Sequence, residues 1–496
     1  MQFYPQPGWV EEDANEIWEA SQFVILDSLK KYDINPKNII AIGICNQRES
    51  TLIWDKKTQE PLSKLIVWQD RRTSNRCDEL KNLGLENKIK NKTGLTIDPY
   101  FSATKLEWLI KNFNNNYYYK KNEKNRVNNK NNTIIINNTN SINIKNSINN
   151  NKSFFKNIAF GTLDSWILFK LSGNHMTDAS NASRTMLFNI FEDNWDNELL
   201  DIFNIPENIL PQVMPTFGNA IFGFTKKDSV FGHKIPICCI FGDQQSALFG
   251  QKCFKKGDIK STYGTGSFIM VNNGFNKNTS NNNLISTIFY KSFKNEIFYG
   301  IEGSIYNAGS IFQWLKDGLG IIKSFDEIEK LAFDINYQSN LYFVPAFTGL
   351  GAPYWDPYAR AILIGIMRST NKKEIVRACI ESIAYRTRDV MIAMAKDCNH
   401  EFEQLKIDGG VSQNNLFCQI LADLTGVKII KNNLKEITAL GSFFGAGIGI
   451  GLWKTPYDIE EKNIQEEYTS KITDNERTKL YLKWLDAVSR SRNWAI

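Results

Sequence analysis

Two apolar segments that run directly into polar residues constrain the fold of this chain most strongly. Residues 39–44 are almost wholly aliphatic and lead into Asn46-Gln47-Arg48-Glu49, and residues 236–241 lead into Gly242-Asp243-Gln244-Gln245. Short continuous apolar runs of this kind are typical of strands buried on both faces of a sheet. Open α/β sheets place their binding sites at the carboxyl ends of such strands.

Helical and strand-like segments alternate along the rest of the chain. Residues 374–395 have apolar side chains at helical spacing, whereas residues 341–345 and 405–407 read as further strands. Strands interleaved with helices predict the α/β class. Since 496 residues exceed one ordinary hydrophobic core, we expect at least two domains.

Composition excludes several classes of protein. The net charge of +6 is small for this length and forms no basic stripe, so we expect no nucleic-acid partner. Eight cysteines without a C-x-x-C pair predict reduced thiols in a cytoplasmic protein. The first ten residues do not resemble a secretory signal. The longest uncharged stretch, residues 437–453, is shorter than the ~20 residues of a membrane span, so we predict a buried helix and no transmembrane segment.

Three segments suggest how the chain is divided. Residues 112–152 are dominated by Asn and Lys, and they predict a disordered surface insertion with no catalytic role. A break near residues 250–258 predicts a boundary between a first domain, residues 1–250, and a second domain, residues 251–496. The Lys- and Asn-rich residues 272–283 are expected to form the tip of a long hairpin.

Carboxylates are the expected proton-transfer groups, because none of the three histidines lies beside a candidate nucleophile or carboxylate motif. Asp243 follows a strand and a glycine, where it could accept the proton of an alcohol that attacks phosphorus. An Asp at this place could equally cap the next helix. The motif alone leaves both interpretations open.

The Arg48-Glu49 pair also has two interpretations. An Arg supplies only hydrogen-bond donors and an ionised Glu only acceptors, so together they suit the neighbouring hydroxyls of a polyol. As a dipeptide alone, it is more often an exposed surface pair.

Two glycine pairs could approach phosphate groups. Residues 260–271 predict a strand, a turn with Gly264-Thr265-Gly266, and a second strand; successive N–H groups in such a turn can cradle a phosphate. A plain hairpin turn looks the same. Gly409-Gly410 follows another strand, and by itself it is a similarly weak indication of phosphate binding. No Walker-type motif is present, which disfavours a P-loop fold.

Taken in order, the motifs resemble those of the glycerol kinases in the FGGY family of carbohydrate kinases. They occupy residues 48–51, 68–72, 98–105, 181–186, 242–245, 263–266, 345–355 and 408–410. The resemblance extends over most of the chain except the Asn-rich insertion. It implies two actin/hexokinase-like (ribonuclease H-like) ATPase domains around a cleft, the first binding the polyol and the second the nucleotide.

The resemblance also implies roles for particular residues. Those that match the glycerol-hydroxyl ligands are Arg48, Glu49, Tyr100, Asp243 and Gln244, and those that match the walls along its carbon chain are Trp68 and Phe268. Asp243 matches the general base and would contact Mg²⁺ through water. Those that match ATP-binding positions are Gly264, Thr265, Gly309, Gln313, Gly410 and Asn414.

Two departures from the family pattern are expected to matter. A first strand–turn–strand unit with a loop like Asp-Gln-Gly-Thr-Thr-Ser is expected before Tyr4 and is missing, which would expose sheet edges. In the family this loop supplies N–H and hydroxyl groups that bind phosphate. The loss of one such preorganised hydrogen-bond donor costs about 2.7–4 kcal/mol of transition-state stabilisation in a comparable enzyme. Residues 224–233 lack the Gly-rich, Arg-containing loop through which some members bind fructose 1,6-bisphosphate, so this control is not expected.

The resulting hypothesis is an ATP-dependent glycerol kinase that uses Mg²⁺ and forms glycerol 3-phosphate. One alternative is a catalytically impaired remnant that still binds polyols. Another is a different FGGY sugar kinase, such as a pentulose kinase. Family members often form dimers or tetramers, so a homo-oligomer is also open.

Overall fold

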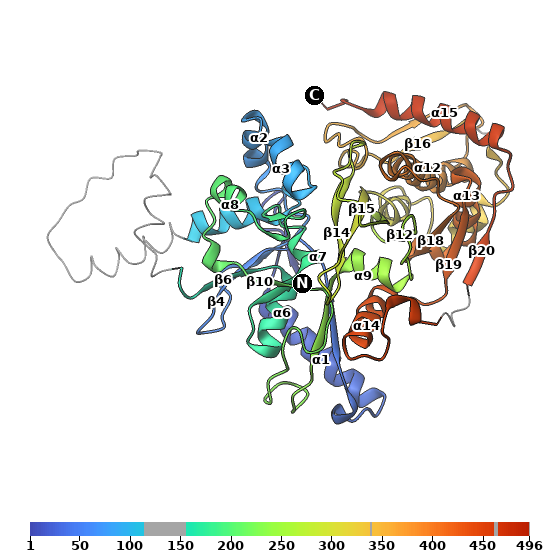
Figure 1. Ribbon diagram of the computed structural model, residues 1–496. Coiled ribbons are helices and arrows are strands. Elements are labelled where there is room, and N and C mark those ends of the chain that lie inside the picture. Colours follow the sequence, from blue (N-terminus) through green and yellow to red (C-terminus); the bar gives the residue numbers. More distant parts are fainter. Residues whose placement is uncertain (114–154, 338–339, 461–464, 496) are drawn as a thin grey trace, which may run out of the picture. The chain divides into compact units, whose positions relative to one another are not determined.

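The computed structural model describes residues 1–113, 155–337, 340–460 and 465–495 (Figure 1). Their contacts define two units. Unit 1 comprises residues 1–243, 290–297 and 445–454, and unit 2 comprises residues 244–289, 298–444 and 455–496. The predicted insertion, residues 112–152, lies almost wholly outside the described residues. The predicted domain boundary after residue 250 stays a prediction, since the chain enters each unit more than once.

Unit 1 combines short paired strands with helices. Its strands are β1 (Gln2–Phe3), β2 (Glu11–Glu12), β3 (Ile42–Asn46), β4 (Leu52–Asp55), β5 (Leu65–Ile66), β6 (Ile158–Gly161), β7 (Met176–Asp178), β8 (Phe188–Asn189), β9 (Asn194–Trp195), β10 (Gln212–Met214) and β11 (Ile237–Gly242). Its helices are α1 (Ala14–Lys31), α2 (Ser74–Asn82), α3 (Glu86–Thr93), α6 (Leu163–Ser172), α7 (Ala179–Ala182) and α8 (Asn197–Phe203), with 3₁₀ turns at Pro36–Asn38 and Glu207–Ile209. Residues 102–113 are also helical.

The parallel pair of β3 and β11 is the part of unit 1 that matters most for function. Its register matches Gly242 with Asn46, so both strands end at the same edge. Both strands were predicted, but β3 begins three residues later than expected and continues through Asn46. The polar residues that follow β3 and β11 therefore emerge next to each other, as expected for strand ends in an α/β fold.

Unit 2 is organised around a seven-stranded sheet in the order β14-β15-β13-β12-β18-β19-β20. Its strands are β12 (Ile259–Tyr263), β13 (Ser267–Gly274), β14 (Ile285–Lys291), β15 (Ile297–Ile305), β18 (Gln404–Asp408), β19 (Lys428–Asn432) and β20 (Gln465–Tyr468), with β16 (Tyr342–Val344) and β17 (Ile362–Ile364) as a separate pair. Its helices are α9 (Asp243–Gly250), α10 (Gly309–Gln313), α11 (Asp326–Ala332), α12 (Lys372–Cys398), α13 (Asn415–Thr425), α14 (Ile437–Gly449) and α15 (Asp474–Ser491); the first residue of α9 and the last five of α14 belong to unit 1. Shorter turns of helix occur at Trp314–Gly318, Val411–Gln413 and Pro456–Asp458.

The helix predicted at residues 374–395 is α12. A capping box closes its start, because Asn371 accepts from the N–H of Lys373 while the side chain of Glu374 accepts from the N–H of Asn371. Asn399 ends the helix in the left-handed conformation. Helix α14 corresponds to the predicted apolar helix. In the part of the chain that the structure describes, no helix is long and apolar enough to cross a bilayer.

The prediction that residues 272–283 form a hairpin tip is wrong. They connect β13 to β14, but β15 lies between these two strands in the sheet. The hairpin is instead formed by β14 and β15, whose turn is closed by the N–H of Ser292 donating to Glu296 O at 2.9 Å. Strand periodicity gave no information on which strands are neighbours, and the intervening β15 decides the pairing.

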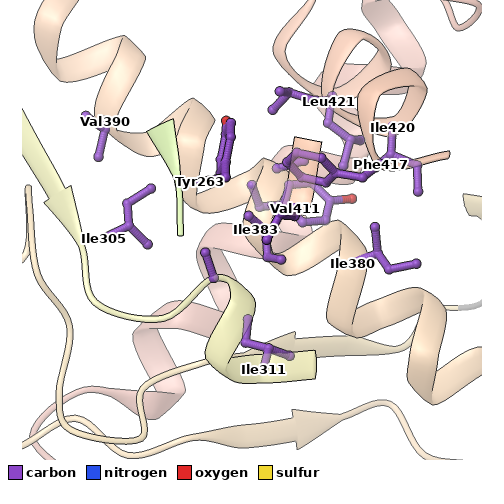
Figure 2. Packing of buried hydrophobic residues seen from close by; sticks show 14 of the residues in the cluster. Tyr263, Ile305, Ile311, Ile380, Ile383, Val390, Val411, Phe417, Ile420 and Leu421 are labelled. Carbon is purple, nitrogen blue, oxygen red and sulfur yellow. The ribbon is translucent and has the colours of Figure 1, made fainter. Parts of the chain in front are cut away.

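A dense apolar core lies beneath the sheet of unit 2. Figure 2 shows Tyr263 beside Phe417, with side chains from α12 and α13 around them. The rings of Tyr263 and Phe417 meet edge to face at 4.9 Å, and the Tyr263 hydroxyl is 2.9 Å from Thr387 Oγ1. Tyr263 is fully buried and ends β12. The core therefore fixes the point at which the Gly264-Thr265-Gly266 turn begins.

Gly409 makes the closest backbone approach in this region. Its φ is +94°, and a Cβ added there would lie 2.3 Å from Tyr263 O. A left-handed residue other than glycine costs roughly 1–2 kcal/mol, and forcing extra atoms into a packed core costs about 1–3 kcal/mol more. Only glycine therefore lets the end of β18 lie against the end of β12.

We expect Gly409→Ala to lower the free energy of unfolding by about 3 kcal/mol, from the sum of these two effects. The measurement is urea unfolding of the full chain, followed by tryptophan fluorescence. Gly84→Ala is the matched control, because Gly84 has a φ of +72° but no atom within 4 Å of an added Cβ. An equal decrease in the free energy of unfolding in the two variants would show that the close approach of Gly409 to Tyr263 does not contribute to stability.

Candidate active site

Arg48 and Glu49 are buried in unit 1, each 2% exposed, so the interpretation as a surface pair is wrong. They follow β3, and the chain turns inward at Glu49, whose φ is +61°. Two hydroxyls hold this turn by donating to Glu49 O: Thr51 Oγ1 at 2.9 Å and Ser102 Oγ at 3.0 Å. A strained conformation of this kind persists only where the surroundings determine it.

Four charged side chains alternate in sign around this turn. Arg48 Nε lies 2.9 Å from Asp243 Oδ1 and 3.9 Å from Glu49 Oε1, and Arg184 Nε donates to Glu49 Oε1 at 2.6 Å. Two cations and two carboxylates balance one another, which buried charges require. The Asp243 side chain is the most open of the four, at 33% exposed. Asp243 is also the first residue of α9, so it begins this helix and belongs to the charged cluster as well.

Two aromatic residues adjoin the charged cluster. The rings of Trp68 and Tyr100 are 5.7 Å apart at 84°, and the N–H of Trp68 donates to Ser50 Oγ at 3.3 Å. The Arg184 guanidinium lies 5.6 Å from the centre of the Tyr100 ring. Unit 1 thus brings together five of the predicted site residues: Arg48, Glu49, Trp68, Tyr100 and Asp243. Charged groups beside aromatic walls suit a small ligand with hydroxyls and C–H faces.

Lys105 holds the backbone of the Tyr100 segment through hydrogen bonds. The sequence reasoning missed this role. Its ammonium is fully buried and donates to Pro99 O at 3.0 Å and to Tyr100 O at 2.5 Å. Burial lowers the pKa of Lys105 to about 8, against the opposing effect of Glu49 and Asp70. A lysine inside the 98–105 motif was the only available signal, and lysines are usually exposed.

In unit 2 the glycine-rich turn and the start of α10 form one structure. The N–H groups of Ala308 and Ser310 donate to Thr265 O at 2.9 and 3.1 Å, and the N–H of Gly309 donates to Gly264 O at 2.9 Å. A Cβ on Gly309 would lie 2.6 Å from Gly264 O. The structure therefore brings Gly264, Thr265 and Gly309 together, and Gln313 ends the same helix.

The second glycine turn lies beside the first, because Gly409 packs on Tyr263. Gly410 has no atom within 4 Å of an added Cβ, and Gly264 has none closer than 3.9 Å. Both glycines thus border open space, where backbone can approach a phosphate group. Asn414 caps α13 by accepting from the N–H of Phe417 at 2.8 Å, a structural role that the sequence did not indicate.

Gln244 and Phe268, the remaining predicted residues, also lie in unit 2. Lys260 Nζ donates to Gln244 Oε1 at 2.5 Å and reaches Phe268 O at 3.5 Å. Lys260 is fully buried and also donates to Thr262 Oγ1 at 2.9 Å. Sequence reasoning missed Lys260, since a lysine in an exposed β-hairpin would look the same.

Lys105 predicts a pH dependence of stability. Its folded-state pKa of about 8 lies below the ordinary lysine value of 10.5, so folding disfavours its protonated form. Burying the protonated lysine lowers the free energy of unfolding by its full amount below pH 8, and this loss disappears as pH rises from 8 to 10.5. At 1.36 kcal/mol per pKa unit, the free energy of unfolding rises by up to about 3 kcal/mol over this range.

We therefore expect the stability of the wild type relative to Lys105→Met to rise between pH 8 and 10.5. Urea unfolding of both proteins at several pH values measures the difference, and other titrating groups cancel in it. A difference that stays constant with pH would contradict a depressed pKa at Lys105.

Both parts of the chain match models of one protein family. Residues 1–120 and 115–250 match the N-terminal domain of the FGGY family of carbohydrate kinases, and residues 259–449 match its C-terminal domain. The chain is 44% identical to glycerol kinase 2 of Thermotoga maritima and 42% identical to glycerol kinase of Staphylococcus haemolyticus. Each alignment covers 99% of this chain and 92% of the relative.

Solved structures agree with the sequence relatives. Plasmodium falciparum glycerol kinase with ADP has a TM-score of 0.84 and 33% identity, over 99% of this chain and 92% of that one. Xylulose kinase from Lactobacillus acidophilus, at 23% identity and a TM-score of 0.80 over 99% of this chain and 91% of that one, shares the fold. The matched domains span most of the sequence, and the chain belongs to the FGGY family of carbohydrate kinases.

Proposed function

We propose that this chain transfers the γ-phosphate of ATP to glycerol, giving sn-glycerol 3-phosphate and ADP. The observation that carries the proposal is the buried cluster around Arg48, Glu49 and Asp243, with Trp68 and Tyr100 beside it. The relatives named glycerol kinase support the same substrate. We assign polyol binding to residues 1–250 and nucleotide binding to residues 251–496.

The glycerol-binding groups follow from hydrogen-bond chemistry. Arg48 donates to hydroxyl oxygens and Glu49 accepts from hydroxyl hydrogens, so adjacent hydroxyls of one triol are satisfied together. Tyr100 and Gln244 are assigned to the remaining hydroxyl contacts. Trp68 and Phe268 are assigned to the carbon chain, which aromatic faces cover without demanding hydrogen bonds.

Asp243 is assigned as the general base. Its carboxylate accepts the proton of the attacking hydroxyl while a bond forms between that oxygen and the γ-phosphorus, and the bond from phosphorus to the ADP oxygen breaks. Arg48 holds Asp243 Oδ1 in place at 2.9 Å. Phosphoryl transfer depends mainly on such positioning and on charge stabilisation.

ATP is assigned to the glycine turns of unit 2. The open space beside Gly264 and Gly410 allows phosphates to approach the backbone. The assigned nucleotide contacts are Gly264, Thr265, Gly309, Gln313, Gly410 and Asn414.

A magnesium ion fits this arrangement. Among the described residues, no group of three or more His, Cys, Asp or Glu side chains could enclose a metal. Mg²⁺ commonly uses one or two carboxylates together with water and substrate phosphates, so Asp243 acting through water suffices on the protein side. When bound, the ion would neutralise the developing charge on the phosphates.

Two alternatives from the sequence remain as proposals. A catalytically impaired polyol-binding protein would bind glycerol in calorimetry but release no ADP in a coupled assay. Another FGGY sugar kinase would prefer a pentulose over glycerol when the two compete. The eight free thiols support the predicted cytoplasmic location, and a homo-oligomer stays a prediction.

We expect Asp243→Asn to lower kcat for glycerol phosphorylation by about 10²–10⁴-fold, because the amide cannot accept the proton. The KM for ATP should change little, since the amide has the same shape as the carboxylate. A coupled assay of ADP release measures both constants. Asp486→Asn, which alters a carboxylate that is 61% exposed on α15, serves as the control. An Asp243→Asn protein with undiminished kcat would exclude Asp243 as the base.

A further inference from the structure

Arg184 is a buried cation to which the proposed chemistry assigns no role. It is 0% exposed and follows α7, whose start is capped by Asp178. The Arg184 N–H donates to Asn181 O at 3.0 Å, and the neighbouring Thr185 O accepts from the N–H of Ala103 at 2.8 Å. The backbone that carries Arg184 is therefore held at both sides.

The Arg184 side chain contacts two of the residues that are proposed to bind glycerol. Its Nε donates to Glu49 Oε1 at 2.6 Å, and its guanidinium carbon lies 5.6 Å from the Tyr100 ring centre and 5.3 Å from that of Phe101. A planar guanidinium can donate a hydrogen bond to a carboxylate while its faces lie against aromatic rings. Lysine offers neither geometry.

Glu49 needs such a partner. Its carboxylate is buried, and Arg48 Nε lies 3.9 Å from Glu49 Oε1 but 2.9 Å from Asp243 Oδ1. Without the Arg184 guanidinium, the buried Glu49 carboxylate would lose one of its charged partners and would turn toward Arg48, because a buried charge is costly unless it is well compensated. This change would move the acceptor that faces the substrate and would disturb the Arg48–Asp243 pair.

We propose that Arg184 is a positioning residue that sets the affinity for glycerol by fixing the Glu49 carboxylate and the Tyr100 ring. It acts through these two residues and does not take part in proton transfer. This inference rests on the proposed function, because it assumes that Glu49 and Tyr100 bind glycerol.

The test compares Arg184→Lys with Arg377→Lys. Arg377 is a close structural match in unit 2: its Nε donates to Glu381 Oε1 at 2.6 Å, both side chains are 5% exposed, and its guanidinium lies 4.5 Å from the Tyr337 ring centre. Both variants should lower the thermal midpoint. Only Arg184→Lys should raise the KM for glycerol, by at least about tenfold, with the KM for ATP within about twofold of the wild type.

A double-mutant cycle with Glu49→Gln tests whether Arg184 acts through Glu49. If it does, Arg184→Lys should raise the glycerol KM much less in the Glu49→Gln background than in the wild type. Additive effects would overturn the proposal. So would a glycerol KM within twofold of the wild type, or an equal rise in Arg377→Lys. If Arg184→Lys yields little folded protein, Arg184→Gln, which keeps an N–H donor without the charge, is measured with the same expectation.

Calorimetric titration of glycerol without ATP separates this inference from the proposed function. A wild type that binds glycerol but shows no turnover contradicts kinase activity, and a tenfold weaker glycerol Kd in Arg184→Lys would still support the role of Arg184. Equal Kd values in the two proteins overturn that role. A wild type that neither binds nor phosphorylates glycerol removes both proposals together.

Discussion

The parallel pairing of β3 with β11 is the constraint on which the polyol side of the molecule depends. Because the register matches Asn46 with Gly242, the segments that follow the two strands start at one edge of the sheet. Arg48 reaches Asp243 at 2.9 Å only because nearly 200 residues of intervening chain return to this edge. A shift of one residue in this register would turn these side chains to other faces of the sheet.

Buried charge is the second organising principle, and it makes the site both polar and rigid. The alternating order of Arg184, Glu49, Arg48 and Asp243 lets each charge neighbour one of opposite sign. Such clusters contribute little net stability, but removing one member leaves the others uncompensated. The unusual backbone at Glu49 and the buried ammonium of Lys105 belong to the same arrangement, in which scaffold side chains hold the groups that would meet the substrate.

Unit 2 holds its glycine turns by close backbone packing. Gly409 lies against Tyr263, and the N–H groups at the start of α10 bond to the carbonyls of the Gly264-Thr265 turn. The turn is thus held from two sides, while Gly264 and Gly410 keep open space in front of them. The core in Figure 2 provides the rigid support, since Tyr263 is packed against Phe417 and bonded to Thr387.

The sequence by itself determined the α/β class, the main strands and helices, and the motifs whose order indicates the FGGY family. These features depend on local periodicity and on residue types at fixed spacing, which are visible in one chain. The tertiary structure decided which strands are neighbours, as shown by β15 lying between β13 and β14. It also decided which charges are buried. As a dipeptide, Arg48-Glu49 also fitted an exposed surface pair, and the sequence did not indicate that Arg184, Lys105 and Lys260 are buried, because burial depends on elements distant in sequence.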